Sequence, residues 1–85
     1  MNRSEIFAKI DAICRKIFGE GIVITEKTAA TDIEKWDSMN HVTLIATIEK
    51  EFAVTFDIME IIGITTIGDF VDLIEKNKTD ADYRN

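Results

Sequence analysis

The residues that could do chemistry gather in one short segment. Trp36-Asp37-Ser38-Met39 places a carboxylate beside a hydroxyl, and the only histidine, His41, follows three residues after Ser38. Residues three apart on a helix are neighbours, so a contact between Ser38 and His41 is conceivable. A hydrolytic triad also needs an acid that orients the base, and an oxyanion site. Because Asp37 precedes the expected helix and is suited to bind its backbone N–H groups, we do not predict an enzyme.

No second site is indicated elsewhere in the sequence. Cys14 is the only cysteine and falls on the apolar face of the first expected helix, which favours a place in the core. One cysteine and one histidine make no cluster of metal ligands, so we expect no metal. Gly19-x-Gly21 lacks a preceding strand and does not indicate nucleotide binding. A chain of 85 residues is expected to form one small domain with a thin core.

Charge and hydropathy argue against two classes of function. The net charge is −6, whereas a nucleic-acid-binding surface needs basic side chains that meet phosphates. No apolar stretch approaches the roughly 18 residues of a membrane span. The segment after Met1 is charged and amphipathic, unlike a signal peptide. We therefore expect a cytoplasmic monomer that binds no nucleic acid and has no membrane span. We also expect a free-standing protein, since the sequence starts at Met1 and ends without a linker.

Periodic apolar residues predict the elements that position the segment around Ser38. Steps of three and four indicate helices over 5–18, 38–52 and 66–77, and a short helix over 57–62. Residues 19–35 lack a sustained period and are expected to form a long loop whose apolar residues dock on the helices. The predicted fold is an all-α four-helix bundle with three long helices, one short helix and a long first loop.

The ends and buried faces of these helices can also be predicted. Ser4 is expected to cap the first helix, Thr66 with Asp69 to cap the last one, and Asn77 to end it. Residues 1–77 then form the single domain, and 78–85 a polar, frayed tail. Two of Ile58, Met59, Ile61 and Ile62 are expected in the core. The predicted buried stripes of the second and last helices are Val42, Ile45, Ile48 and Phe52, and Ile67, Phe70, Val71 and Ile74.

The segment from Thr31 to Asp69 resembles the acyl and peptidyl carrier proteins. Asp37-Ser38-Met39, followed by an apolar stripe and Glu49-Lys50-Glu51-Phe52, is similar to the family's Asp-Ser-Leu opening of its second helix. Ile64-Thr65-Thr66-Ile67-Gly68-Asp69 looks like the start of the family's last helix, and the spacing from Ser38 to Thr66 needs no gap. The resemblance covers about residues 5–77, which is nearly the whole chain.

The resemblance implies a four-helix bundle whose motif serine, here Ser38, is esterified with 4′-phosphopantetheine from coenzyme A. The terminal thiol of that arm holds an acyl or aminoacyl group as a thioester, and the carrier itself catalyses nothing. The implied partners are a phosphopantetheinyl transferase, an acyl- or aminoacyl-loading ligase and acyl-processing enzymes. Recognition by the transferase and other partners maps to the motif neighbours Asp37 and Met39. A phosphodiester at Ser38 would sit at a helix N-terminus, where the helix dipole favours an anion.

The polar face of the second expected helix departs from the pattern of fatty-acid carriers. Those carriers place acids where this chain has Asn40, Thr43 and Thr47, so we expect weak electrostatic steering and a partner that supplies hydrogen bonds and apolar contacts. The predicted partner surface consists of Asn40, His41, Thr43, Ala46 and Met59. These departures favour a carrier dedicated to a secondary or cell-surface product over a housekeeping fatty-acid carrier. The alternative is a helical protein–protein interaction module without a prosthetic group.

Overall fold

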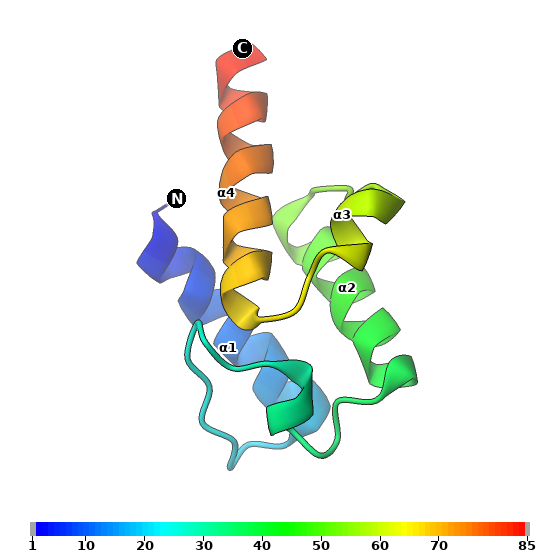
Figure 1. The fold of residues 1–85 in the computed structure, drawn as a ribbon. Helices are drawn as coiled ribbons and strands as arrows, with labels where there is room; N and C mark the ends of the chain where they lie inside the picture. The colour runs from blue at the N-terminus through cyan, green and yellow to red at the C-terminus, as the bar shows by residue number, and fades with distance from the viewer. Residues whose placement is uncertain (1, 85) are drawn as a thin grey trace.

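The computed structural model describes residues 2–84, and the side chains of residues 2–77. Four α-helices follow one another along the chain, and a single turn of 3-10 helix, η1, lies in the first loop. Their bounds are α1 (Arg3–Phe18), η1 (Ala30–Asp32), α2 (Ser38–Phe52), α3 (Ile58–Ile62) and α4 (Ile67–Arg84). Helix α1 packs against both α2 and α4 (Figure 1). Within residues 2–84 there is no strand, only a β-bridge between Ala29 and Thr66. The predicted four-helix, all-α fold is confirmed.

The core is a single cluster of apolar side chains from α1, α2, α4 and the three loops between the helices. The first loop contributes Ile24 and Trp36, so the expected docking of this loop on the helices is confirmed. Full burial of one such side chain contributes about 1.5–3 kcal/mol. The buried residues of α1, α2 and α4 are Ile6, Ile10, Ile13, Cys14 and Phe18; Leu44, Ile45, Ile48 and Phe52; and Ile67, Phe70, Val71 and Ile74.

Two predictions about buried residues are wrong. Val42 is 66% exposed. At 3.6 residues per turn it points more than a quarter turn away from the centre of the α2 stripe. In α3 only Ile61 packs against the core, whereas Ile58, Met59 and Ile62 are exposed. Within the described residues only the side of α3 that carries Ile61 faces the core, and no element covers the other three side chains.

Two predicted helix ends also differ from the structure. Helix α1 is capped by Asn2 and not by Ser4: Asn2 Oδ1 accepts from the Glu5 N–H at 2.9 Å, and Glu5 Oε1 accepts from the Asn2 N–H at 3.2 Å. Helix α4 continues to Arg84 and does not end at Asn77. No glycine or proline follows Asn77, so the sequence supplies no stop signal there. The fraying of residues 78–85 stays a prediction.

The first loop is fixed to the start of α4. The carbonyl oxygens of Thr28 and Glu26 accept from the N–H groups of Ile67 and Gly68, at 2.9 and 2.8 Å. The guanidinium of Arg3 joins this contact, because it binds the carboxylate of Glu26 and also reaches Asp72 and Glu75 on α4. The two backbone hydrogen bonds donated by Ile67 and Gly68 fix the position of the first loop before the chain reaches residue 36.

Candidate functional site

The two residues at the start of α2, Asp37 and Ser38, have different roles. Asp37 is the N-cap: its Oδ1 accepts from the Asn40 N–H at 2.8 Å, and its carbonyl accepts from the His41 N–H at 2.8 Å. Ser38, the first residue of the helix, is therefore not needed as a cap. Its side chain is exposed, and its hydroxyl makes no hydrogen bond to any residue in the described part of the chain.

The first turn of α2 keeps donors available for an anion. The N–H groups of Ser38 and Met39 have no acceptor within residues 2–84. Unpaired N–H groups at a helix start, together with the helix dipole, stabilise negative charge in front of them. The residues present thus suit a phosphodiester attached to the Ser38 oxygen.

Two residues from the predicted partner surface bind their own chain at this point. Asn40 Nδ2 donates to the carbonyl of Lys35 at 2.7 Å, and His41 Nδ1 accepts from the indole N–H of Trp36 at 3.0 Å. Both side chains are half-buried. They connect the first two turns of α2 back to the segment that precedes the helix, and so fix the backbone on either side of Ser38.

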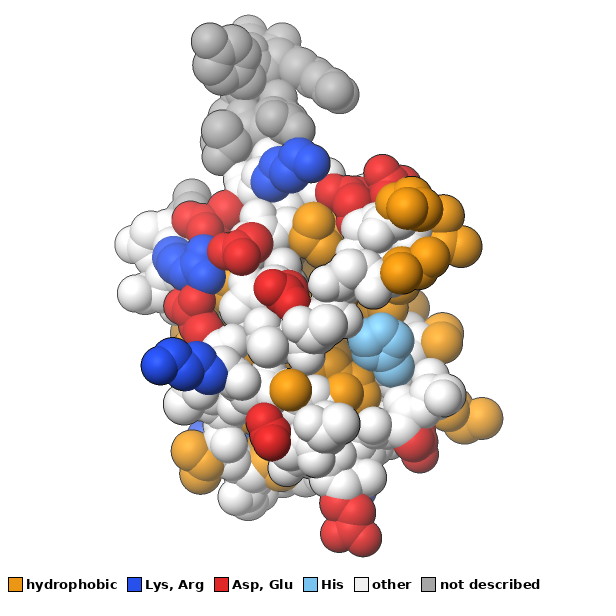
Figure 2. Space-filling model, viewed as in Figure 1, with side chains coloured by type: hydrophobic (Ala, Val, Ile, Leu, Met, Phe, Trp, Pro, Cys, Tyr) orange, Lys and Arg blue, Asp and Glu red, His pale blue; other side chains and the backbone are white. Residues whose placement is uncertain are grey.

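The other residues of the predicted partner surface lie open to solvent. Thr43 and Ala46 are exposed on α2, and the Thr43 hydroxyl bonds only back to the carbonyl of Met39. Met59 on α3 is 73% exposed, and Met39 beside Ser38 is 78% exposed. In Figure 2, apolar side chains gather on the right of the molecule, over the region of α3.

Trp36 forms the base of the site. It is 7% exposed and its ring stacks on Phe18 of α1, with centroids 5.3 Å apart, and on Phe70 of α4, at 6.5 Å. A buried tryptophan usually needs an acceptor for its N–H. The pairing of Trp36 with His41 was not predicted from the sequence, although His41 is a suitable acceptor five residues away.

A cavity of about 490 Å³ opens beside Ser38. Trp36, Asp37, Ser38, His41 and Val42 line it, with Ala30 from η1 on the far side. A neighbouring hollow of about 340 Å³ shares Ala30, Trp36 and His41, and it extends to Ile64 and Thr65 before α4. The exposure of Val42 and the position of Ala30 depend on tertiary packing, and nothing in the sequence singled them out as parts of this site.

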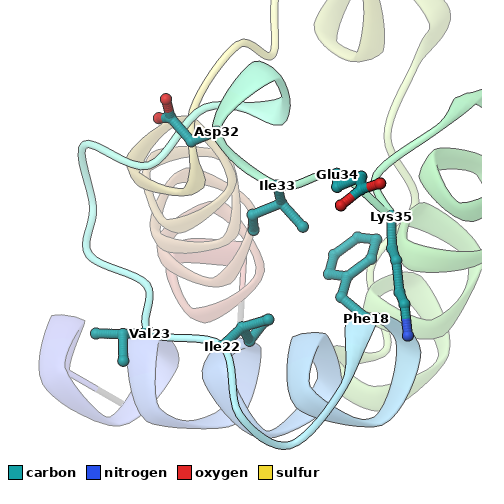
Figure 3. Close-up of a pocket in the computed structure, with 7 residues that line it drawn as sticks. All are labelled: Phe18, Ile22, Val23, Asp32, Ile33, Glu34 and Lys35. Atoms are coloured by element: carbon teal, nitrogen blue, oxygen red, sulfur yellow. The ribbon is translucent and has the colours of Figure 1, made fainter.

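A separate hollow of about 330 Å³ lies where the first loop crosses the end of α1 (Figure 3). Its apolar side chains, Phe18, Ile22 and Ile33, turn toward a common space, while Asp32 points away from it. The residues that line it include no histidine, cysteine or serine.

Three further observations concern chemistry away from Ser38. Burial, and secondarily the charge of Asp11, raise the pKa of the Cys14 thiol to about 12, which agrees with its predicted place in the core. Within the described residues, no three His, Cys, Asp or Glu side chains are placed to hold a metal ion. No helix in that same part of the chain is both long and apolar enough to cross a membrane.

Comparisons with known proteins agree with this geometry. Residues 9–74 match the family described as "Phosphopantetheine attachment site". An acyl carrier protein from Thermotoga maritima is 36% identical over 76 residues, which cover 88% of this chain and 94% of that protein. The solution structure of a holo acyl carrier protein from Geobacter metallireducens superposes with a TM-score of 0.85 at 30% identity, covering 94% of this chain and 93% of that one. The chain therefore belongs to the acyl carrier protein family, whose members are phosphopantetheine-bearing carriers and not catalysts.

Proposed function

We propose that Ser38 is the residue that carries 4′-phosphopantetheine. The observation that supports this most strongly is the exposed Ser38 hydroxyl at the start of α2, left unbonded within residues 2–84 because Asp37 caps the helix. The unpaired N–H groups of Ser38 and Met39 add a favourable environment for the phosphodiester. When bound, the arm supplies a terminal thiol that holds an acyl or aminoacyl group as a thioester.

Coenzyme A is the only donor that the attachment of the arm to Ser38 requires. The Ser38 oxygen forms a bond to the phosphorus atom next to pantetheine, and the bond from that phosphorus to the bridging pyrophosphate oxygen breaks. Adenosine 3′,5′-bisphosphate leaves, and the hydroxyl proton passes to a base of the transferase. The chain itself contributes an accessible hydroxyl, a rigid helix start and donors that face the new anion.

The exposed apolar side chains of α2 and α3 are the proposed contact surface for partner enzymes. Met39 and Val42 lie on α2, and Ile58, Met59 and Ile62 on α3, and each is between 66% and 78% exposed. Large exposed apolar residues that gather in one place mark interaction sites. Between Ser38 and Phe52 the only acidic or basic side chains apart from His41 are Glu49, Lys50 and Glu51, at the far end of α2. Docking through apolar contact should therefore depend little on salt.

We further propose that the chain serves a dedicated secondary or cell-surface pathway in the cytoplasm. Support comes from the same departure from acidic fatty-acid carriers: Asn40 and His41 are occupied in holding the helix start, and Thr43 and Thr47 bond to backbone carbonyls. Basic docking patches on fatty-acid enzymes would find few acids on this face. The loading ligase is expected to have an apolar docking patch instead.

The attachment proposal is tested by intact mass after incubation with coenzyme A and a broad-specificity phosphopantetheinyl transferase. The expected result is a gain of one phosphopantetheinyl group, absent in Ser38→Ala. The chain offers a matched control, since Ser4 is its only other serine and is exposed on α1. Ser4→Ala should gain the same mass as the unaltered chain.

Equal loading of Ser38→Ala would refute the assignment of the residue. No loading of a chain whose helical circular dichroism is intact would favour the alternative, a helical interaction module.

The pathway is tested separately by offering the loaded chain and an acidic fatty-acid carrier to the same fatty-acid enzymes. We expect the acidic carrier to be acylated much faster, with a rate that falls as salt rises, and equal rates would contradict the proposal.

A further inference from the structure

Trp36 and His41 form a hydrogen-bonded pair directly beside Ser38. The indole N–H can only donate, so His41 Nδ1, 3.0 Å away, accepts with its lone pair. In the neutral imidazole the proton then resides on the other nitrogen, Nε2, which is left as a donor. The contact thus selects one tautomer of the histidine as well as one ring position.

The position of the imidazole ring is fixed from several sides. Its centroid lies 6.0 Å from that of Trp36, nearly parallel at 27°, and 6.3 Å from that of Phe70. Trp36 is itself held between Phe18 and Phe70. The His41 backbone belongs to the first turn of hydrogen bonds in α2, through the carbonyl of Asp37. A side chain held in this way keeps its orientation before a ligand arrives.

The same ring lines the cavity that Ser38 lines. The other polar side-chain atoms around this cavity already have hydrogen-bond partners or become part of the ester. The Trp36 N–H is used by His41, the Asp37 carboxylate accepts from the Asn40 N–H, and the Ser38 oxygen becomes part of the ester. Nε2 of His41 is therefore the side-chain donor that remains for a group attached to Ser38.

We propose that Trp36 and His41 are a positioning pair for the phosphodiester at Ser38. Trp36 orients the imidazole, and His41 Nε2–H donates a hydrogen bond to a phosphodiester oxygen. The arm thereby leaves Ser38 along the cavity and does not swing freely. This inference rests on the proposed attachment at Ser38. His41 is a positioning residue here and takes no part in forming or breaking the ester bond.

The decisive measurement needs no variant. The ¹⁵N resonances of the His41 ring are recorded at neutral pH in the unloaded and loaded chain, with loading verified by mass. We expect the Nδ1 resonance to stay in place, because Trp36 still binds it, and the Nε2 resonance to shift on loading. A ring whose two resonances are unchanged on loading would overturn the inference while leaving the attachment at Ser38 intact. A chain that gains no mass would overturn both.

Variants separate positioning from a merely structural role through the ³¹P resonance of the loaded chain. His41→Asn keeps an acceptor near Nδ1 but loses the donor at Nε2, so the ³¹P resonance should move. His41→Gln places an amide donor near Nε2 and should return the resonance toward the unaltered position. Trp36→Phe keeps an aromatic ring at this position and removes the N–H, and it should move the resonance in the same direction as His41→Asn.

The combination of Trp36→Phe with His41→Asn should shift the ³¹P resonance no further than His41→Asn alone, because Trp36 acts on the phosphodiester only through His41. Glu51→Gln is the control: this side chain is exposed on the same helix, away from the cavity, and the change should leave the resonance in place. An unchanged ³¹P resonance in folded His41→Asn would overturn the inference. Equal effects of His41→Asn and His41→Gln would do so as well.

Discussion

Helices α2 and α4 begin with similar side-chain caps, but they differ in whether the first backbone N–H groups are hydrogen-bonded. At the start of α2, Asp37 caps the helix, and the N–H groups of Ser38 and Met39 meet no acceptor in residues 2–84. At the start of α4, the N–H groups of Ile67 and Gly68 are bound by carbonyls of the first loop. The helix start that is left open can face a ligand, and the one that is closed joins two parts of the fold.

The capping geometry of α4 shows how thoroughly that end is closed. Asp69 Oδ2 accepts from the N–H groups of Thr65 and Thr66 at 2.8 and 3.0 Å, and Thr66 Oγ1 accepts from the Asp69 N–H at 3.3 Å. The predicted capping box of Thr66 and Asp69 is thus confirmed. Ile67 beside it is fully buried. Changes at this end should affect folding, whereas changes at the α2 end should affect loading more than folding.

The largest expected effect is that of Gly68→Ala. A Cβ atom at residue 68 would lie 2.9 Å from the Glu26 carbonyl oxygen, so the loop would have to move off α4. Overpacking of this kind costs about 1–3 kcal/mol. Gly63→Ala is the control, because a Cβ there meets only ordinary contacts of 3.6 Å or more. Urea unfolding measures both, and a Gly68→Ala chain as stable as Gly63→Ala would show that the loop is not held at this point.

A smaller, pH-dependent effect is expected for Asp69→Asn. The hydrogen bonds from Thr65 and Thr66 lower the pKa of the Asp69 carboxyl below its ordinary 3.8. A lowered pKa in the folded state adds stability above the unfolded pKa, and that stability is lost as pH falls through the folded value. Asp69→Asn should therefore be less stable by about 1 kcal/mol at pH 7.

The difference in unfolding free energy between the unaltered chain and Asp69→Asn should shrink once the pH falls below 3.8. Urea titrations at a series of pH values test this. A difference that is constant from pH 7 to strongly acid solution would contradict a role for the ionised carboxylate at the start of α4.

The smallest effect on stability is expected at the start of α2. Asp37→Ala removes the cap and should cost about 1 kcal/mol or less, whereas Asp37→Asn keeps an oxygen that accepts from the Asn40 N–H. Unfolding experiments and the loading rate should separate these two variants. If Asp37 also contributes its charge to transferase recognition, Asp37→Asn will fold normally and load slowly. Normal loading of Asp37→Asn would limit Asp37 to the capping role.

The sequence predicts those features of the fold that follow from local periodicity. The stripes of α1 and α4, the cap at Asp37 and the box at Thr66 all repeat patterns that a single helix imposes on its own residues. The cap of α1 is an exception, because the box of Asn2 and Glu5 is also a local pattern and Ser4 was predicted in its place. Other predictions fail where a second element decides the outcome. The short α3 leaves Ile62 exposed because no element packs over it within residues 2–77.

The candidate site shows the same limit. The place of Ser38 at a helix start could be predicted from the motif, because Asp37 and Ser38 are both good residues for that position. The roles of Asn40 and His41 could not, because their partners, Lys35 and Trp36, lie in a segment without periodicity. Only the folded path of residues 33–37 shows that these two side chains bind their own chain.

Trp36 gives the protein an optical property of its own. It is the only tryptophan in the sequence, so indole emission has one origin, and that origin lies in the wall of the cavity beside Ser38. The imidazole of His41 touches the same ring and is well placed to influence its excited state. Loading and unloading at Ser38 should therefore be visible as a change in intrinsic fluorescence, without a label, in a continuous assay of the enzymes that attach or remove the arm.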